Sequence, residues 1–272
     1  MERKKLDSRP VGVFDSGVGG LTVLREIISQ VPNESLIYFG DTARFPYGTK
    51  NLEDVKKFVF KIVEFLCSKQ VKLIVIACNT ASAAALEDLR ANFDIPVIGV
   101  IEPGARTAAG NTHCKRIGVI ATEGTVRSRA YDSAIEKIDP DIRLFSSAAP
   151  LLVEYIEKGI LKGDGLNRQI LAYLEPIIKE DIDVLILGCT HFPLIEKQIA
   201  ECCNAGFKII SSAIETAKDV KNTLDRLDMH SPVGLKTART FYETGKDSKL
   251  HEFGKMFFGR EIPEAVKVKL DL

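Results

Sequence analysis

Two cysteines stand at matching points of the sequence, each directly after a run of apolar residues. Cys78 lies in Leu73-Ile-Val-Ile-Ala-Cys78-Asn-Thr, and Cys189 lies in Val184-Leu-Ile-Leu-Gly-Cys189-Thr-His, 111 residues further on (189 − 78). A thiol suits acid–base work because its pKa of about 8.5 is near neutral pH and responds to its surroundings. His191 follows Cys189 by two residues and could deprotonate or orient that thiol. The two segments together predict a pair of thiols that carry protons.

Either cysteine alone would be a weak signal, because cysteines at strand ends usually pack as small apolar groups. A Cys-His hydrolase or transferase with a covalent intermediate would use Cys189 and His191, but it leaves Cys78 without a role. No C-x-x-C pair occurs, and the cysteine spacings predict neither a zinc site nor a disulfide framework. We interpret the remaining cysteines as structural; these are Cys67, Cys114, Cys202 and Cys203.

Short apolar runs alternate with longer helical patterns along most of the chain. The predicted strands are Val11–Phe14, Leu36–Phe39, Leu73–Ala77, Val97–Val100, Ile117–Ile120, Ile142–Phe145, Val184–Leu187 and Lys208–Ile210. Helical patterns include Leu21–Gln30, Leu52–Gln70, Ala81–Asn92, Ala148–Lys158 and Leu166–Glu180. This alternation predicts an α/β fold with mainly parallel sheets, in which the loops after the strands lie along one edge.

The repeat extends beyond the two cysteines. Gly12-Val-Phe-Asp-Ser-Gly resembles Gly118-Val-Ile-Ala-Thr-Glu-Gly, and Val97–Glu102 matches Ile210–Glu215 more weakly. Chance likeness of apolar strands is the alternative, but it does not explain the matching cysteines. We therefore predict two similar, doubly wound domains related by a pseudo-twofold axis, with the active site in the cleft between them. The first domain comprises residues 1–100 with 211–272, and the second comprises 101–210.

Composition excludes several classes of function. Lys and Arg together number 37, and so do Asp and Glu. The resulting zero net charge does not indicate binding to nucleic acid or to an anionic membrane. The opening MERKKLDSRP has no apolar segment behind it, and no apolar run approaches the roughly 18 residues of a membrane span. We expect a cytoplasmic protein whose thiols stay reduced.

Two loops are rich in small residues. Asp15-Ser-Gly-Val-Gly-Gly20 follows a strand and opens a helix, a setting in which backbone N–H groups favour an anion. The segment is neither a G-x-G-x-x-G fingerprint nor a P-loop. An ordinary tight turn is the alternative, as it is for Phe45-Pro-Tyr-Gly48.

Four motifs in register resemble the glutamate racemase family over nearly the whole chain. They are Asp15-Ser-Gly-Val-Gly-Gly-Leu-Thr, Gly40-Asp41 with Pro46-Tyr-Gly48, Ala77-Cys-Asn-Thr80, and Gly188-Cys-Thr-His-Phe-Pro193. Members of that family interconvert L- and D-glutamate without a cofactor and supply D-glutamate for bacterial peptidoglycan. The resemblance implies glutamate bound between two α/β domains, no metal, no organic cofactor, and a homodimer.

The same resemblance implies roles for individual residues. Cys78 and Cys189 are the catalytic thiols, with Cys78 taking the proton from D-glutamate and Cys189 from L-glutamate. Asp15 supports Cys78, while His191 and Glu154 support Cys189. The implied substrate contacts are Asp15, Ser16, Pro46, Tyr47, Gly48, Asn79, Thr80, Thr125, Thr190 and His191.

Racemisation by itself demands two proton carriers, because the proton leaves one face of the α-carbon and another arrives on the opposite face. One carrier must be a thiolate while the other is a thiol, and donors in a closed cleft must stabilise the carbanion. The nearest rival is a racemase of the same superfamily that acts on aspartate or a hydantoin. A non-catalytic binding protein on the same scaffold would not require both cysteines.

Overall fold

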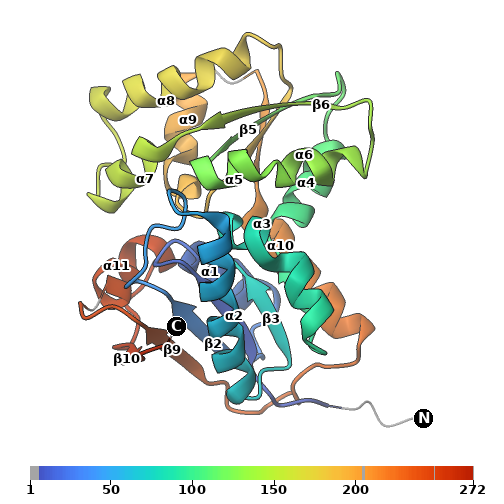
Figure 1. Ribbon diagram of the computed structural model, residues 1–272, viewed down its shortest axis with the longest axis vertical. Helices are drawn as coiled ribbons and strands as arrows, with labels where there is room; N and C mark the ends of the chain where they lie inside the picture. The colour runs from blue at the N-terminus through green and yellow to red at the C-terminus, as the bar shows by residue number, and fades with distance from the viewer. Residues whose placement is uncertain (1–5, 204–205, 248, 272) are drawn as a thin grey trace.

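The predicted apolar runs form two separate parallel sheets, each covered by helices on both faces (Figure 1). The computed structural model describes residues 6–203, 206–247 and 249–271. The first five residues of the predicted first domain lie outside this description. In Figure 1 the larger sheet, with α1, α2 and α11, occupies the lower part, and the smaller sheet, with α5–α9, occupies the upper part.

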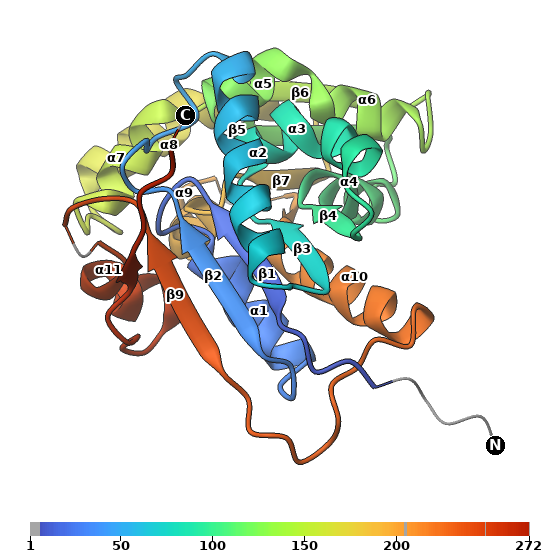
Figure 2. The same ribbon diagram turned by 60° about the horizontal axis from the view of Figure 1, so that its bottom comes forward.

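The larger sheet has six strands in the order β10-β9-β2-β1-β3-β4, and all its neighbouring pairs are parallel. Figure 2 shows β9, β2, β1 and β3 side by side. Its strands are β1 (Val11–Asp15), β2 (Leu36–Gly40), β3 (Leu73–Ile76), β4 (Val97–Gly99), β9 (Arg239–Glu243) and β10 (Val266–Lys267). Alternate residues of β1 face opposite layers, so that Val13 packs in one apolar cluster and Phe14 in another. The helices of the Val13 side are α1 (Leu21–Gln30), α10 (Ser212–Arg226) and α11 (Lys249–Phe258), and those of the Phe14 side are α2 (Leu52–Ser68) and α3 (Asn79–Asn92).

The smaller sheet has the order β6-β5-β7-β8 and is also parallel. Its strands are β5 (Arg116–Ala121), β6 (Arg143–Ala148), β7 (Val184–Gly188) and β8 (Lys208–Ser211). One face carries α7 (Pro150–Glu157), α8 (Asp164–Ile178) and α9 (Glu196–Cys202), and the other carries α4 (Ile101–Ala109) and α6 (Ala130–Glu136). Two short helices, α5 (Glu123–Ser128) and the 3-10 turn η1 (Phe192–Ile195), follow β5 and β7.

The two sheets share one connectivity, because β2-β1-β3-β4 corresponds to β6-β5-β7-β8. This agreement confirms the predicted fold class and the internal repeat. Cys78 after β3 and Cys189 after β7 occupy equivalent positions. The strands of the larger sheet lie within residues 11–99 and 239–267, and those of the smaller within 116–211. The boundary residues between the two domains remain a prediction.

All eight predicted strands are present, and six of them begin at the predicted residue. The predicted helix Ala148–Lys158 began too early, since Ala148 still belongs to β6 and the helix starts at Pro150. Proline suits the first helical position because the N–H that it lacks would have no partner there. Strand β9, Arg-Thr-Phe-Tyr-Glu, was missed because it has no continuous apolar run, and it is identified only by its pairing with β2.

A buried ion pair joins the base of the larger sheet to segments far away in sequence. The Lys72 side chain is fully buried beside Glu34, with 2.6 Å between Nζ and Oε2. Nζ also donates to the carbonyl oxygens of Asp7 at 2.7 Å and Met229 at 2.6 Å. One ammonium group therefore links the start of β3 to the chain before β1 and to the segment after α10.

We predict that Lys72→Met destabilises the protein by about 3–5 kcal/mol, because it leaves the Glu34 carboxylate buried without its cation. Chemical denaturation would measure the loss. Lys56→Met is the control, since the Lys56–Asp88 pair lies at the surface and should contribute little. Equal denaturation midpoints for the two variants would contradict the prediction.

Candidate active site

A cavity of about 460 Å³ lies where the loops at the carboxyl ends of the two sheets meet. Ser16 comes from the loop after β1, and Phe45–Thr49 from the loop after β2. The cavity wall also contains Cys78, Asn79, Thr80, Thr122, Glu123, Pro150, Val153, Glu154, Glu157, Lys158, Cys189, Thr190 and His191. Six loops from two sheets thus enclose one site, and both thiols are in its wall.

Most of the predicted site residues are in this wall, but two are not. Asp15 is the last residue of β1 and lies behind the wall, 1% exposed, with its Oδ2 accepting from the Gly17 N–H at 3.0 Å. Thr125 is 2% exposed and also lies behind the wall. The predicted contacts of Asp15 and Thr125 with a substrate remain predictions.

Cys78 occupies the N-cap of α3, because the strand ends there and the chain turns directly into the helix. Its sulfur lies 3.7 Å from the Ser16 hydroxyl. Burial and the nearby Asp15 carboxylate raise the pKa of the Cys78 thiol to about 12. The Ala81 N–H and the Ser16 hydroxyl favour the thiolate but do not offset these effects. Cys78 is therefore a protonated thiol near neutral pH.

Cys189 has a different neighbour, the imidazole of His191. His191 Nδ1 lies 3.8 Å from the Cys189 sulfur, and Nε2 lies 3.1 Å from Glu157 Oε1. Burial disfavours the charged imidazole, but the Cys189 sulfur and the Glu157 carboxylate outweigh burial and raise the pKa of His191 to about 10. The Cys189 sulfur and the Glu157 carboxylate thus both favour the protonated form of His191.

The carboxylate that reaches His191 belongs to Glu157, which the sequence analysis did not select. Glu154, the residue selected there, lines the same cavity but is 60% exposed and pairs with Lys158 at 3.7 Å. Leu152 and Ile156 are the buried positions of α7 and form a stripe along it. Glu154 lies opposite the centre of that stripe, and Glu157 lies about 120° from it around the helix. Periodicity therefore places both glutamates off the buried stripe, and Glu157 is identified by its contact with His191.

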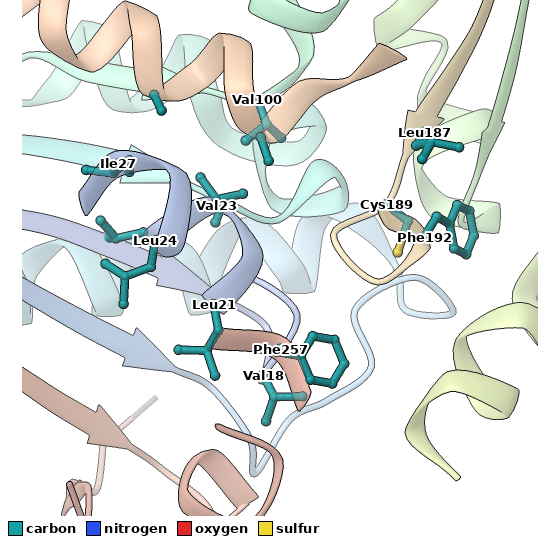
Figure 3. Packing of buried hydrophobic residues seen from close by; sticks show 14 of the residues in the cluster. Val18, Leu21, Val23, Leu24, Ile27, Val100, Leu187, Cys189, Phe192 and Phe257 are labelled. Atoms are coloured by element: carbon teal, nitrogen blue, oxygen red, sulfur yellow. The ribbon is translucent and has the colours of Figure 1, made fainter. Parts of the chain in front are cut away.

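Two aromatic rings enclose the imidazolium of His191. Ring centroids of Phe45 and Phe257 lie 5.9 Å and 5.1 Å from that of His191. Figure 3 shows Phe257 beside Val18, and Phe192 beside Cys189 on the turn after β7. Phe257 comes from α11, near the end of the chain, so no local pattern could connect it with Cys189. The rings exclude water from two sides of His191 and so strengthen its interactions with Cys189 and Glu157.

Three hydroxyl groups from both halves form a triangle at the cavity. Thr80 Oγ1 lies 2.8 Å from Thr122 Oγ1 and 3.2 Å from Thr125 Oγ1, and the last two are 3.0 Å apart. Nearby, Asn79 Oδ1 accepts from the Tyr131 hydroxyl at 2.8 Å, while its Nδ2 has no partner among the described residues. The three hydroxyls can satisfy one another, whereas the Asn79 Nδ2 hydrogens stay unpaired among the described groups. Thr122, the helix N-cap of α5, was not predicted from the sequence.

The loop after β2 contributes Phe45–Thr49 to the wall. The Tyr47 hydroxyl donates to Asp41, so this side chain is held away from a ligand. The Gly48 carbonyl accepts from the Gly124 N–H at 2.7 Å. A Cβ at Gly48 would lie 2.6 Å from the Thr122 Cβ, so only glycine allows the two loops to approach this closely.

A family model described as Asp/Glu/Hydantoin racemase matches residues 11–220. The chain belongs to this racemase family. It is 43% identical over 263 residues to a glutamate racemase of Geobacter metallireducens, with 97% of both chains covered. A crystal structure of the glutamate racemase isoform RacE1 from Bacillus anthracis is similar, with a TM-score of 0.92, 42% identity, and 96% of this chain and 98% of that chain covered. So is a glutamate racemase from Francisella tularensis in complex with D-glutamate, with a TM-score of 0.92, 38% identity, and 97% and 99% covered.

The contact between His191 and Glu157 gives a prediction specific to this racemase family member. Glu157→Gln removes the negative charge beside Nε2, so the pKa of His191 should fall from about 10 towards its ordinary value. NMR titration of histidine labelled with ¹⁵N in the ring would measure the midpoint. Glu154→Gln is the matched control, one turn away on the same helix, and should leave that midpoint unchanged. A larger change in the His191 pKa for Glu154→Gln than for Glu157→Gln would show that Glu154, and not Glu157, is the carboxylate that acts on His191.

Proposed function

We propose that this racemase interconverts L- and D-glutamate, with Cys78 and Cys189 carrying protons at opposite faces of the α-carbon. The observation that carries the proposal is the pair of thiols at equivalent strand ends, both in the wall of one cavity. Full-length relatives at about two-fifths identity that bear the name glutamate racemase support the choice of substrate.

The two thiols have different neighbours, the Ser16 hydroxyl beside Cys78 and the His191 imidazole beside Cys189. Cys78, with its pKa raised to about 12, holds a proton ready to give. Protonated His191 places a positive charge and an N–H 3.8 Å from the Cys189 sulfur, a setting that suits an anionic base. This state is prepared for L-glutamate: Cys189 takes the α-proton, and Cys78 delivers its own to the other face. The reverse reaction starts once the proton has been redistributed between the thiols.

The carbanion formed between these steps requires donors rather than a cofactor in this proposal. In this proposal Ser16, Asn79, Thr80 and Thr190, which line the cavity, hold the amino and α-carboxylate groups of the substrate. The Tyr47–Gly48 backbone and Thr122 would hold the side-chain carboxylate. We propose that Thr125 acts indirectly, by orienting the Thr80 and Thr122 hydroxyls that it contacts.

Asp15 and Glu154 have supporting roles in this proposal. Asp15 keeps the proton on Cys78 through its charge, without lining the cavity. Glu154 stands at the mouth with Lys158 and affects the charge that an entering anion meets. The carboxylate that orients His191 is that of Glu157.

The cellular setting is proposed from the family resemblance. We propose a cytoplasmic homodimer that supplies D-glutamate for peptidoglycan, with residues 1–100 plus 211–272 and residues 101–210 as its two domains. Among the described helices, none combines the length and the apolar character that crossing a membrane requires.

We predict clear preference for glutamate over aspartate. Donors placed for the longer side chain would stay unpaired with the shorter one, at roughly 1–3 kcal/mol for each buried donor. Circular dichroism of either enantiomer incubated with purified protein measures both rates. The family model names aspartate and hydantoin as well, and comparable turnover of aspartate would overturn the choice of substrate.

We also predict that Cys78→Ser and Cys189→Ser each reduce racemisation by roughly 10²–10⁴-fold, because a hydroxyl is a far weaker base of similar size. Cys67→Ser is the control, since Cys67 lies on α2 outside the cavity wall, and it should retain full activity.

A glutamate analogue with a leaving group on the β-carbon distinguishes the two thiols. Its elimination needs only the thiol that removes the α-proton. The Cys78 variant should process the L-form and fail on the D-form, and the Cys189 variant should do the reverse. Loss of the same enantiomer in both variants would contradict the two-thiol mechanism and favour a Cys-His mechanism in the second half.

A further inference from the structure

Thr22, on the first turn of α1, links the larger sheet to the turn that carries Cys189. Its side chain is 1% exposed and is not part of the cavity wall. The hydroxyl oxygen lies 2.9 Å from the Gly19 carbonyl oxygen and 3.0 Å from that of Thr190. Thr190 stands between Cys189 and His191, so this contact reaches the backbone of the reactive turn.

The Thr22 hydroxyl can donate its one proton to only one of the two carbonyls, and the Thr190 carbonyl is the one that lacks a local backbone donor. The Gly19 carbonyl already accepts from the Thr22 backbone N–H at 3.0 Å. The carbonyls on either side of Thr190 each accept from the N–H three residues later, Cys189 from Phe192 at 3.2 Å and His191 from Leu194 at 3.1 Å. For Thr190 that residue is Pro193, which has no N–H. Thr22 therefore supplies, from the other half of the molecule, the donor that the local sequence lacks.

The glycine turn before Thr22 is packed between the two thiol-bearing segments. A Cβ at Gly19 would lie 2.3 Å from Thr190 Oγ1 and 2.6 Å from the His191 ring. A Cβ at Gly20 would lie 3.0 Å from the Cβ of Ala77, the residue before Cys78. The glycine turn thus contacts both the segment that carries Cys189 and the segment that carries Cys78. Because it lies between these segments, its size contributes to the distance between them.

We propose that Thr22 is a positioning residue: its hydrogen bond holds the Cys189 turn against the glycine turn and so fixes the spacing of the two thiols. The inference rests on the proposed glutamate racemisation, in which both thiols must meet one α-carbon. A misplacement of about 1 Å in such an arrangement can cost about 10²-fold in rate.

Elimination provides a reaction that is insensitive to this spacing. One thiolate takes the α-proton of the β-substituted analogue, and the leaving group departs with its bonding electron pair as the Cα–Cβ double bond forms. The second thiol takes no part in that step. A change that merely reduces the folded fraction would lower elimination and racemisation equally, whereas a change in spacing would lower racemisation more.

The test compares Thr22→Val with Thr216→Val. Thr216 is also a fully buried helical threonine, but its hydroxyl donates within α10, to the Ser212 carbonyl at 2.7 Å. Thr22→Val should lower kcat for racemisation by about 10²-fold with little change in KM, and elimination should fall much less. Thr22→Ser should restore racemisation, and Thr216→Val should retain it. Equal losses of both reactions in Thr22→Val, or wild-type racemisation in that variant, would overturn the proposal.

A measurement independent of turnover separates this proposal from the proposed function. Bis-alkylating thiol reagents of two lengths would be applied to the full chain, and mass spectrometry would quantify the Cys78–Cys189 crosslink. Thr22→Val should change the ratio of short to long crosslinks, and Thr216→Val should not. An unchanged ratio would overturn the role of Thr22. Absence of glutamate racemisation in the wild-type protein would instead overturn the proposed function, with the crosslink ratio still deciding the role of Thr22.

Discussion

The two faces of a tetrahedral α-carbon impose the constraint on which this architecture depends: two proton carriers must approach one atom from opposite sides. A single α/β sheet presents its loops along one edge and approaches a ligand from one side. Two sheets of the same connectivity, β2-β1-β3-β4 and β6-β5-β7-β8, bring two such edges together. The equivalent strands β3 and β7 then deliver Cys78 and Cys189 to a shared cavity.

The repeated backbone does not carry a repeated electrostatic environment. Beside Cys78 lies the buried carboxylate of Asp15, whose own pKa is raised by burial and whose charge disfavours a thiolate. Beside Cys189 lies the imidazolium of His191, held by Glu157. Thiols in equivalent backbone positions thus have different neighbours, a carboxylate near Cys78 and an imidazole near Cys189. The asymmetry comes from side chains that the repeat does not share.

Features determined by residues close together in the sequence could be predicted, whereas features that depend on contacts between distant residues were missed. Strand starts such as Val11 and Val184 follow from apolar runs a few residues long, and the thiols follow from their places at strand ends. Phe257 packs on His191 only because α11 docks on the larger sheet, which no local pattern encodes. Glu157 is identified by its contact with His191, a residue 34 positions away in the sequence. Thr22 resembles any helical threonine until its contact with Thr190 is seen.

Crossed contacts between the halves explain why the repeat can hold two thiols at a fixed separation. The turn after β1 reaches the β7 loop through Thr22 and Gly19. The equivalent turn after β5 reaches the β3 loop, since Thr125 contacts the Thr80 hydroxyl and a Cβ at Gly124 would lie 3.0 Å from Thr80 Cγ2. Each half therefore braces the loop that carries the other half's thiol. The pseudo-twofold arrangement then does more than duplicate a thiol, because it makes the position of each thiol depend on the opposite half.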